Sequence, residues 1–214
     1  MIKLNKTGEP DVLLRNKASW TAEYLRQVAA GRGVSPTVAG RYRHEDIKSQ
    51  LVTETSGKCA YCESKMLHVA FGDIEHIRPK SVNPDLTFEW ENLTLVCSVC
   101  NNNKRDYDSP TEPLINPYID NPSDHLRAYG PMVWPKTDSI RGDLTEKLLG
   151  LNRKELFERR KERLESLMHL IENWTRETNQ TRKDILQRQI LEESKEDKEF
   201  SLVIKTFLED SKII

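Results

Sequence analysis

Apolar residues recur every three or four positions in several stretches of the chain, which is the spacing of one face of an α-helix. The first such helix is predicted to stop at Gly31, and its apolar face contains Trp20, Tyr24, Leu25 and Val28. A second helix is predicted over residues 43–56, where Gly57 ends it. Residues 1–18, which contain Gly8 and Pro10, are expected to be irregular.

The end of the chain shows the same helical period. From Thr145 onward the pattern predicts helices throughout. The apolar stripes contain Leu156, Leu164, Leu167, Met168, Ile171 and Trp174, then Ile185, Leu186 and Ile190, and finally Phe200, Val203, Ile204, Phe207 and Leu208. We therefore expect a helical lobe over residues 145–214.

Residues 59–106 have a shorter-range pattern. A strand is predicted from Asp73 to Ile77, where Pro79 stops it, and a second short apolar run covers residues 93–96. Because side chains alternate along a strand, Ile74 and His76 should share one face and Asp73 and Glu75 the other. A helix is expected to start at Asn101 and to continue to about residue 106.

The stretch 107–143 contains six of the ten prolines, so helix is excluded from most of it. Val133 and Trp134 are expected to form a brief edge strand. The predicted architecture is α+β and mostly helical, in three parts: an N-terminal helical segment (1–57), a small core with a proline-rich wrap (58–144) and the C-terminal helical lobe (145–214).

Composition narrows the function classes. The chain is 36% hydrophobic and 31% charged, and it lacks a membrane-length apolar run and an apolar N-terminal segment, so we expect a cytoplasmic protein. The net charge of -1 is not the basic balance of a dedicated nucleic-acid binder. Any contact with nucleic acid should therefore depend on a local basic site or on a partner.

All four cysteines lie in two C-x2-C pairs, Cys59 with Cys62 and Cys97 with Cys100. A reducing cytosol disfavours disulfides, and two such tight turns can supply the four thiolates of a tetrahedral zinc site. Four thiolates leave no position for water. This zinc is therefore predicted to be structural.

The polar residues between and behind the cysteine pairs are the candidates for chemistry. Glu75 and Asn101 offer the hard oxygen ligands that suit Mg2+ or Mn2+, and His76 can act as a general base. Asn92 precedes the second apolar run, and Lys104 with Arg105 could neutralise a phosphate of a nucleic acid.

Simpler interpretations exist for several of these residues. An isolated Glu-His pair is usually an ordinary strand end, and it gains meaning here only from its place between the two cysteine pairs. Asp73 could add a metal ligand. The basic residues Arg153, Lys154, Arg159, Arg160, Lys161 and Arg163 could contact nucleic acid, but a solvated helix face is the simpler interpretation.

The segments "IEHIRPKS", "ENL" and "CSVCNNNK" resemble the HNH, or ββα-metal, nucleases, and the cysteine layout is similar to phage resolvases of the endonuclease VII type. The resemblance implies that His76 is the general base, Glu75 and Asn101 bind the catalytic Mg2+ or Mn2+, and Asn92 braces the loop. Glu75 departs from the Asp that many members carry, so its direct contact with metal stays open.

"SGKCAYCE" and "LLGLNRKELFERRKERLE" extend the resemblance to the PtuB-type HNH proteins of Septu and retron anti-phage systems. It implies an endonuclease that acts on DNA, or alternatively RNA, with a PtuA-like ABC/SMC-type ATPase, and in retrons with a reverse transcriptase and its RNA–DNA product. The chain has no G-x4-G-K-[ST] loop, so a partner must supply ATP chemistry. The alternative is a catalytically silent zinc module that recruits nucleic acid or protein.

Overall fold

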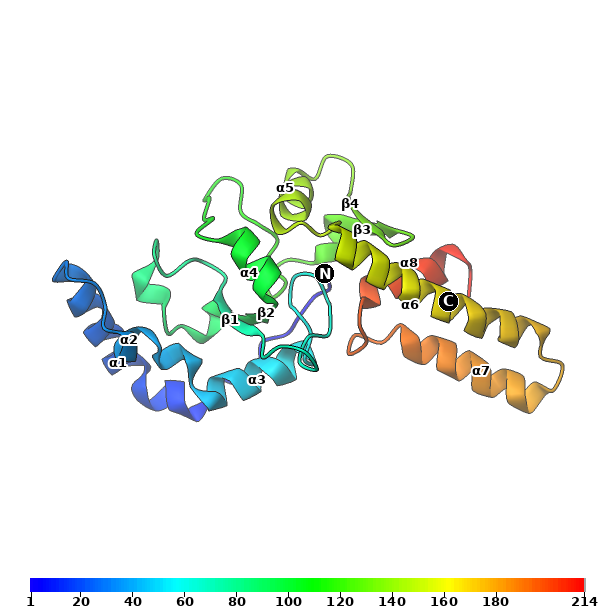
Figure 1. Ribbon diagram of the computed structural model, residues 1–214, viewed down its shortest axis with the longest axis horizontal. Helices are drawn as coiled ribbons and strands as arrows, with labels where there is room; N and C mark the ends of the chain where they lie inside the picture. The colour runs from blue at the N-terminus through cyan, green and yellow to red at the C-terminus, as the bar shows by residue number, and fades with distance from the viewer. Residues whose placement is uncertain (214) are drawn as a thin grey trace.

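The computed structural model describes residues 1–213 (Figure 1). Its helices are α1 (Asp11–Ala29), α2 (Pro36–Ala39), α3 (Glu45–Thr55), α4 (Ser98–Lys104), α5 (Ile140–Leu149), α6 (Lys154–Arg176), α7 (Gln180–Glu193) and α8 (Ser201–Asp210). Its strands are β1 (Asp73–His76), β2 (Leu93–Val96), β3 (Leu126–Tyr129) and β4 (Met132–Pro135). The α+β, mostly helical fold class is confirmed.

The centre of the molecule is an antiparallel β1–β2 pair with α4 packed on β1. The register places Asp73 opposite Val96 and His76 opposite Leu93. All four residues of β2 are buried, so its apolar side chains hold the strand inside the fold. The small sheet therefore fixes where β1 presents its polar side chains.

The N-terminal helices pack beside this centre, as Figure 1 shows on the blue side of the molecule. The expected irregular stretch 1–18 is wrong from Asp11 onward, because α1 begins directly after Pro10. Proline lacks an N–H, which the start of a helix does not need, so Pro10 precedes the helix without breaking it. The second predicted helix is present as α3, which ends where Ser56 and Gly57 take positive φ values of 53° and 69°.

Helix α4 starts at Ser98, three residues before the expected Asn101. The Cys97 thiol caps it by accepting a hydrogen bond from the Cys100 N–H at 3.5 Å. The second cysteine pair is therefore the first turn of the helix itself. This places Asn101 and Lys104 one turn apart on the helix face that covers β1.

The proline-rich stretch forms more regular structure than expected. It contains the hairpin β3–β4, where the sequence suggested only a brief edge strand. Helix α5 begins at Ile140, inside the range expected to be non-helical, because the last proline is Pro135 and Ser139 caps the helix through the Gly142 N–H. The Thr145 hydroxyl accepts a hydrogen bond from the Ile115 N–H at 3.0 Å, which joins this segment to α5.

The C-terminal lobe is helical, as predicted. Helices α6 and α7 form a hairpin that extends away from the body, and α8 packs against β3 (Figure 1). Within residues 1–213, no helix combines the length and the apolar character needed to cross a membrane.

Candidate active site

The four cysteine sulfurs converge on one point. All four Sγ atoms lie within 4.8 Å of one another, and Cys62 and Cys97 are separated by 3.8 Å. Tetrahedral zinc with Zn–S bonds of about 2.3 Å requires sulfurs about 3.8 Å apart. Hydrogen bonds from the Cys100 and Cys59 thiols lower the pKa of the Cys97 thiol to about 7. The donor set therefore fits a zinc ion held between the loop before β1 and the start of α4.

An arginine from the C-terminal lobe lies against this sulfur cluster. The Arg153 guanidinium is 3.7 Å from Cys100 Sγ, 3.8 Å from Cys97 Sγ and 3.9 Å from Cys62 Sγ. A zinc ion with four thiolates carries a net charge of about -2, which a guanidinium can offset. The sequence offered only a basic helix face for Arg153, because nothing local shows that α6 begins beside the cysteines.

Replacing Arg153 with Ala should therefore weaken zinc retention. We expect the zinc affinity to fall about 10- to 100-fold, because the thiolate cluster loses its nearest positive charge. A chelator should then remove the zinc more completely. Zinc release to a colorimetric chelator measures this directly. Lys154→Ala is the matched control, since Lys154 is exposed and pairs only with Glu158. Equal zinc release in the two variants would contradict the assignment.

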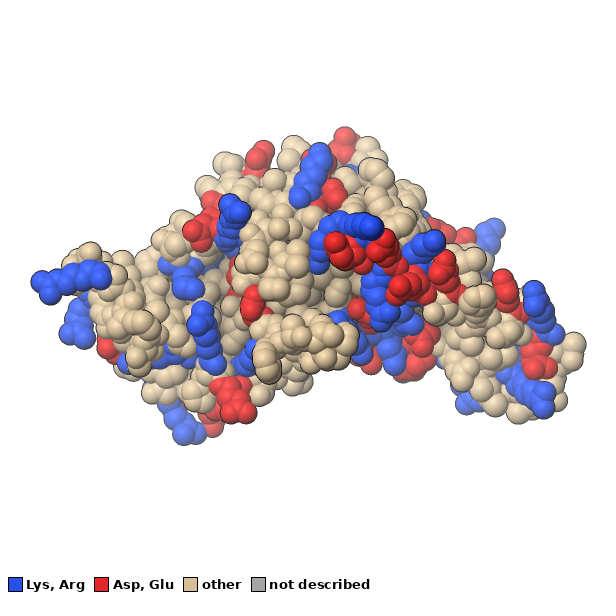
Figure 2. Space-filling view, in the orientation of Figure 1, with Lys and Arg blue, Asp and Glu red and all other residues tan. Residues whose placement is uncertain are grey.

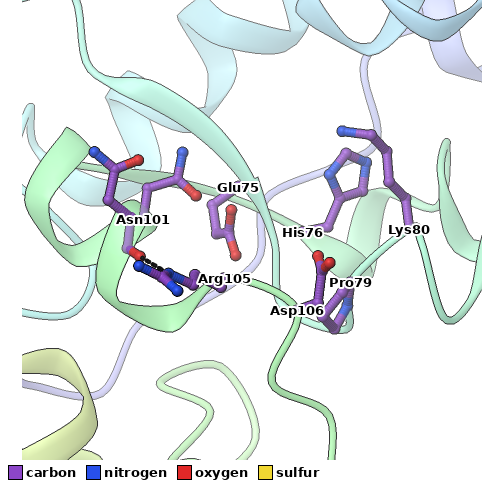
Figure 3. A pocket seen from close by; sticks show the side chains of 8 residues that line it. Glu75, His76, Pro79, Lys80, Asn101, Arg105 and Asp106 are labelled. Atoms are coloured by element: carbon purple, nitrogen blue, oxygen red, sulfur yellow. Dashed lines mark hydrogen bonds between the residues drawn. The ribbon is translucent and has the colours of Figure 1, made fainter.

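Four of the other candidate residues meet in an open cleft of about 500 Å3, which Asn92 and Lys104 do not line. Its lining includes Glu75 and His76 from β1, Asn101 from α4, and Arg105. Figure 3 shows His76 on one side of Glu75, while Asn101 and Arg105 lie on the other. The cleft thus joins a carboxylate, an imidazole and an amide that are 26 residues apart at most in sequence.

His76 is 4% exposed and is held in one orientation. Its Nε2 lies 3.0 Å from the Thr87 carbonyl oxygen, and its ring packs edge-on against Tyr42 at 4.6 Å between centroids. A carbonyl can only accept, so Nε2 carries the proton and Nδ1 is left as an acceptor. Burial, aided by the nearby Lys80 ammonium, lowers the pKa of His76 to about 4. The imidazole is therefore neutral at pH 7 and has a nitrogen that can accept a proton.

This low pKa predicts a pH dependence of stability. The folded pKa of about 4 lies below the ordinary 6.5, so the unfolded chain binds the proton first as the pH falls. Relative to His76→Asn, the wild type should lose about 2 kcal/mol of unfolding free energy between about pH 7.5 and pH 5. Denaturant unfolding at both pH values measures it. A constant difference between the two proteins would show that His76 titrates normally.

Glu75 and Lys104 form a buried ion pair. Lys104 Nζ lies 2.7 Å from Glu75 Oε1 and donates a second hydrogen bond to the His76 carbonyl oxygen at 3.0 Å. Burial raises the pKa of Glu75, and the Lys104 ammonium opposes part of that rise. The sequence predicted that Lys104 neutralises a phosphate, whereas the structure buries Lys104, which is 2% exposed, and directs its charge at Glu75.

Asn101, from α4, lies against the face of β1 that carries Asp73 and Glu75. Its Nδ2 donates to Asp73 Oδ2 at 3.0 Å, which leaves its Oδ1 free of that bond. Asp73 and Glu75 therefore share the strand face that α4 covers, as alternation along the strand predicted. The oxygens of Glu75, Asn101 and Asp73 are hard donors of the kind that Mg2+ and Mn2+ prefer, so the residues present fit such an ion.

Asn92 joins the two ends of the loop between the strands. Its Oδ1 accepts from the Arg78 N–H at 2.8 Å, and its Nδ2 donates to the carbonyl oxygens of Arg78 at 3.0 Å and Leu86 at 3.1 Å. The amide thus uses both of its ends on backbone groups of a loop that also carries Thr87, the partner of His76.

Several residues that line the cleft or pack against its side chains were missed by the sequence prediction. Tyr42 comes from the N-terminal segment, and no local motif marks it. Lys80 lies within "IEHIRPKS" and lines the cleft together with Asp106. Arg105, which the sequence proposed for phosphate binding, is exposed at the cleft, where its Nε donates to the Asn102 carbonyl oxygen at 3.3 Å.

Comparison with known proteins agrees with this arrangement. Residues 59–106 match the HNH endonuclease family. The Septu protein PtuB of Bacillus thuringiensis is 30% identical over 190 residues, which cover 85% of this chain and 69% of the relative. The Septu protein PtuB of Bacillus mycoides is 29% identical over 75% of this chain and 66% of the relative. The HNH protein of retron Vc95 from Vibrio cholerae is 29% identical over 58% of this chain and 66% of its own length. With the ββα core and the cysteine cluster, these matches show that the chain belongs to the PtuB-type HNH endonuclease family.

Proposed function

We propose that this protein hydrolyses phosphodiester bonds of nucleic acid in the cleft between β1 and α4. One observation carries the proposal. The neutral imidazole of His76 lines the same cleft as a carboxylate and an amide oxygen suited to a divalent metal, and no hydrogen bond within residues 1–213 uses its Nδ1. Such a set can activate water beside a phosphate.

The residues in and around the cleft have separate roles in the proposed reaction. His76 Nδ1 accepts a proton from the attacking water, while Thr87 holds Nε2 and Tyr42 holds the ring in place. Asn92 keeps the Thr87 loop closed through its three backbone hydrogen bonds. Arg105, at the rim of the cleft, contacts a phosphate of the bound strand.

Glu75 and Asn101 would hold a Mg2+ or Mn2+ ion, with Asp73 as their neighbour. When bound, such an ion offsets the negative charge that develops on the phosphate and on the leaving oxygen. Lys104 Nζ holds the Glu75 carboxylate through Oε1 at 2.7 Å. We infer that Lys104 positions this carboxylate.

The partners follow from the relatives. The names Septu and retron belong to those proteins, and we propose that this chain likewise serves in cytoplasmic anti-phage defence. The chain lacks a phosphate-binding G-x4-G-K-[ST] loop, so we propose a PtuA-like ATPase as its partner, and a reverse transcriptase with its RNA–DNA product in a retron setting. Figure 2 shows the two signs of charge interspersed over one face, which suits a nuclease whose grip on nucleic acid comes partly from a partner.

The direct test incubates the purified protein with plasmid DNA and Mn2+ or Mg2+, with and without the ATPase partner, and with a structured RNA in parallel. We expect DNA cleavage that requires the metal. A protein that stays silent on both substrates in the presence of an activated partner would contradict the proposal. It would then favour a zinc module that only recruits nucleic acid or protein.

A further inference from the structure

A second pocket lies directly beside the cleft and has no role in the chemistry described above. Its volume is about 390 Å3. Four consecutive residues line the two sites: Ile77 and Arg78 line the second pocket, whereas Pro79 and Lys80 line the cleft. Lys104 lines the second pocket while it bonds to Glu75 of the cleft. A strand whose phosphate lies in the cleft can therefore place a neighbouring group in this pocket.

Two buried polar groups in this pocket have unused hydrogen-bonding capacity. Tyr61 is 2% exposed as a residue and lines the pocket, and none of the hydrogen bonds within residues 1–213 uses its hydroxyl. An ammonium carries three donors, and Lys104 uses two of them on Glu75 and on the His76 carbonyl. Its third N–H has no acceptor among the described residues. Because both groups line the pocket, they can donate to a ligand that presents acceptor atoms.

The rest of the pocket is suited to a flat, uncharged group. Ile77, Tyr107 and Ile119 contribute apolar surface. The arginines at the pocket are already paired, Arg78 with Asp108 at 3.4 Å and Arg141 with Asp120. Their charge is offset by these carboxylates, which makes the pocket a poor site for a free phosphate. A volume of this size with apolar walls and few polar groups is typical of a small planar ligand.

We propose that the second pocket binds one nucleobase of the substrate strand, next to the phosphate that is cut. This inference rests on the proposed nuclease function. Tyr61 and Lys104 present donors, so the favoured base offers two adjacent acceptors on one edge, as guanine does with O6 and N7. Tyr107 supplies an aromatic side chain against which the base can stack. The pocket would then set the sequence preference of cleavage.

The first experiment blocks the mouth of the pocket. Ile119 is 78% exposed and lines the pocket, so Ile119→Trp should fold normally and fill the entrance. Ile140→Trp is the matched control, because Ile140 is 68% exposed and lines neither the cleft nor this pocket. In a His76→Ala background, strands that carry 8-vinylguanine, a fluorescent guanine analogue that keeps O6 and N7, at successive positions are bound as DNA and as RNA, and their fluorescence is recorded. One position should change in emission, and Ile119→Trp should abolish that change and weaken binding about tenfold.

The second experiment removes one donor. Tyr61→Phe deletes only the hydroxyl, and Tyr24→Phe is the control because Tyr24 is also buried but lines neither the cleft nor the pocket. Sequencing of the cut ends should show that Tyr61→Phe relaxes the base preference by about tenfold, whereas Tyr24→Phe leaves it unchanged. Cleavage with the same base preference in Ile119→Trp, Tyr61→Phe and wild type would overturn the pocket alone. A protein that binds a base in the fluorescence assay but never cleaves would overturn the proposed function alone, and one that does neither would overturn both.

Discussion

His76→Ala should abolish cleavage while the protein keeps its fold and its zinc. The buried imidazole is the proposed general base of the cleft, with its Nε2 held by Thr87 and its pKa lowered to about 4. Removal of a positioned general base costs about 10²- to 10⁴-fold in rate. The measurement is the rate of plasmid cleavage under the metal-dependent conditions that test the proposed function, together with zinc content and thermal unfolding.

The matched control is His169→Ala. His169 is exposed on α6, in the C-terminal lobe, so its loss should leave cleavage, zinc and stability unchanged. Wild-type rates in the His76 variant would remove His76 from the reaction. Loss of zinc or of cooperative unfolding in that variant would instead show that His76 acts on the fold, through its packing against Tyr42.

Loss of the zinc site should unfold the central part of the protein. The four cysteines join the loop before β1 to the start of α4, and this link brings Asn101 and Lys104 to the face of β1. Structural zinc of this kind stabilises small domains by about 10–16 kcal/mol, more than the net stability of a typical domain. Cys100→Ala, or chelation of the wild type, should therefore remove zinc and abolish cooperative thermal unfolding of the core.

Ser98→Ala is the matched control for Cys100→Ala. Ser98 lies in the same turn but is exposed and is not part of the sulfur cluster. It should retain one zinc per chain by elemental analysis and unfold like the wild type by circular dichroism. A Cys100 variant that keeps the wild-type melting curve after losing its metal would show that the fold holds the cleft together without zinc.

The strands and the cysteine turns were predictable from the sequence because they depend on residues that are close together in the chain. Strand β1 and the run 93–96 were recognised from apolar alternation and from the proline that follows β1. The two cysteine pairs predicted a shared metal because each pair already places two thiolates on one turn. The start of α4 was missed by three residues because the capping group is a cysteine thiol, which is not among the usual capping residues.

Long-range neighbours were not predictable in the same way. Lys104 follows the second cysteine pair in a basic, asparagine-rich run, and nothing in that run shows that its ammonium is buried against Glu75, 29 residues earlier. Arg153 stands in a charged helix whose polar face looks solvated, yet it lies against the sulfurs. In both cases the charge acts on a group that only the packing of separate elements brings near.

The sequence by itself determined the local chemistry of this protein: four thiolates in two tight turns, a Glu-His pair on a strand and an asparagine directly behind the last cysteine. These depend on the spacing of neighbouring residues, which the chain carries without folding. Only the tertiary structure decided that His76 is neutral and oriented, that Lys104 holds Glu75, that Arg153 faces the zinc site and that a second pocket adjoins the cleft. Each of these results depends on burial and on contacts across 11 to 91 residues of sequence, which arise only when separate elements pack together.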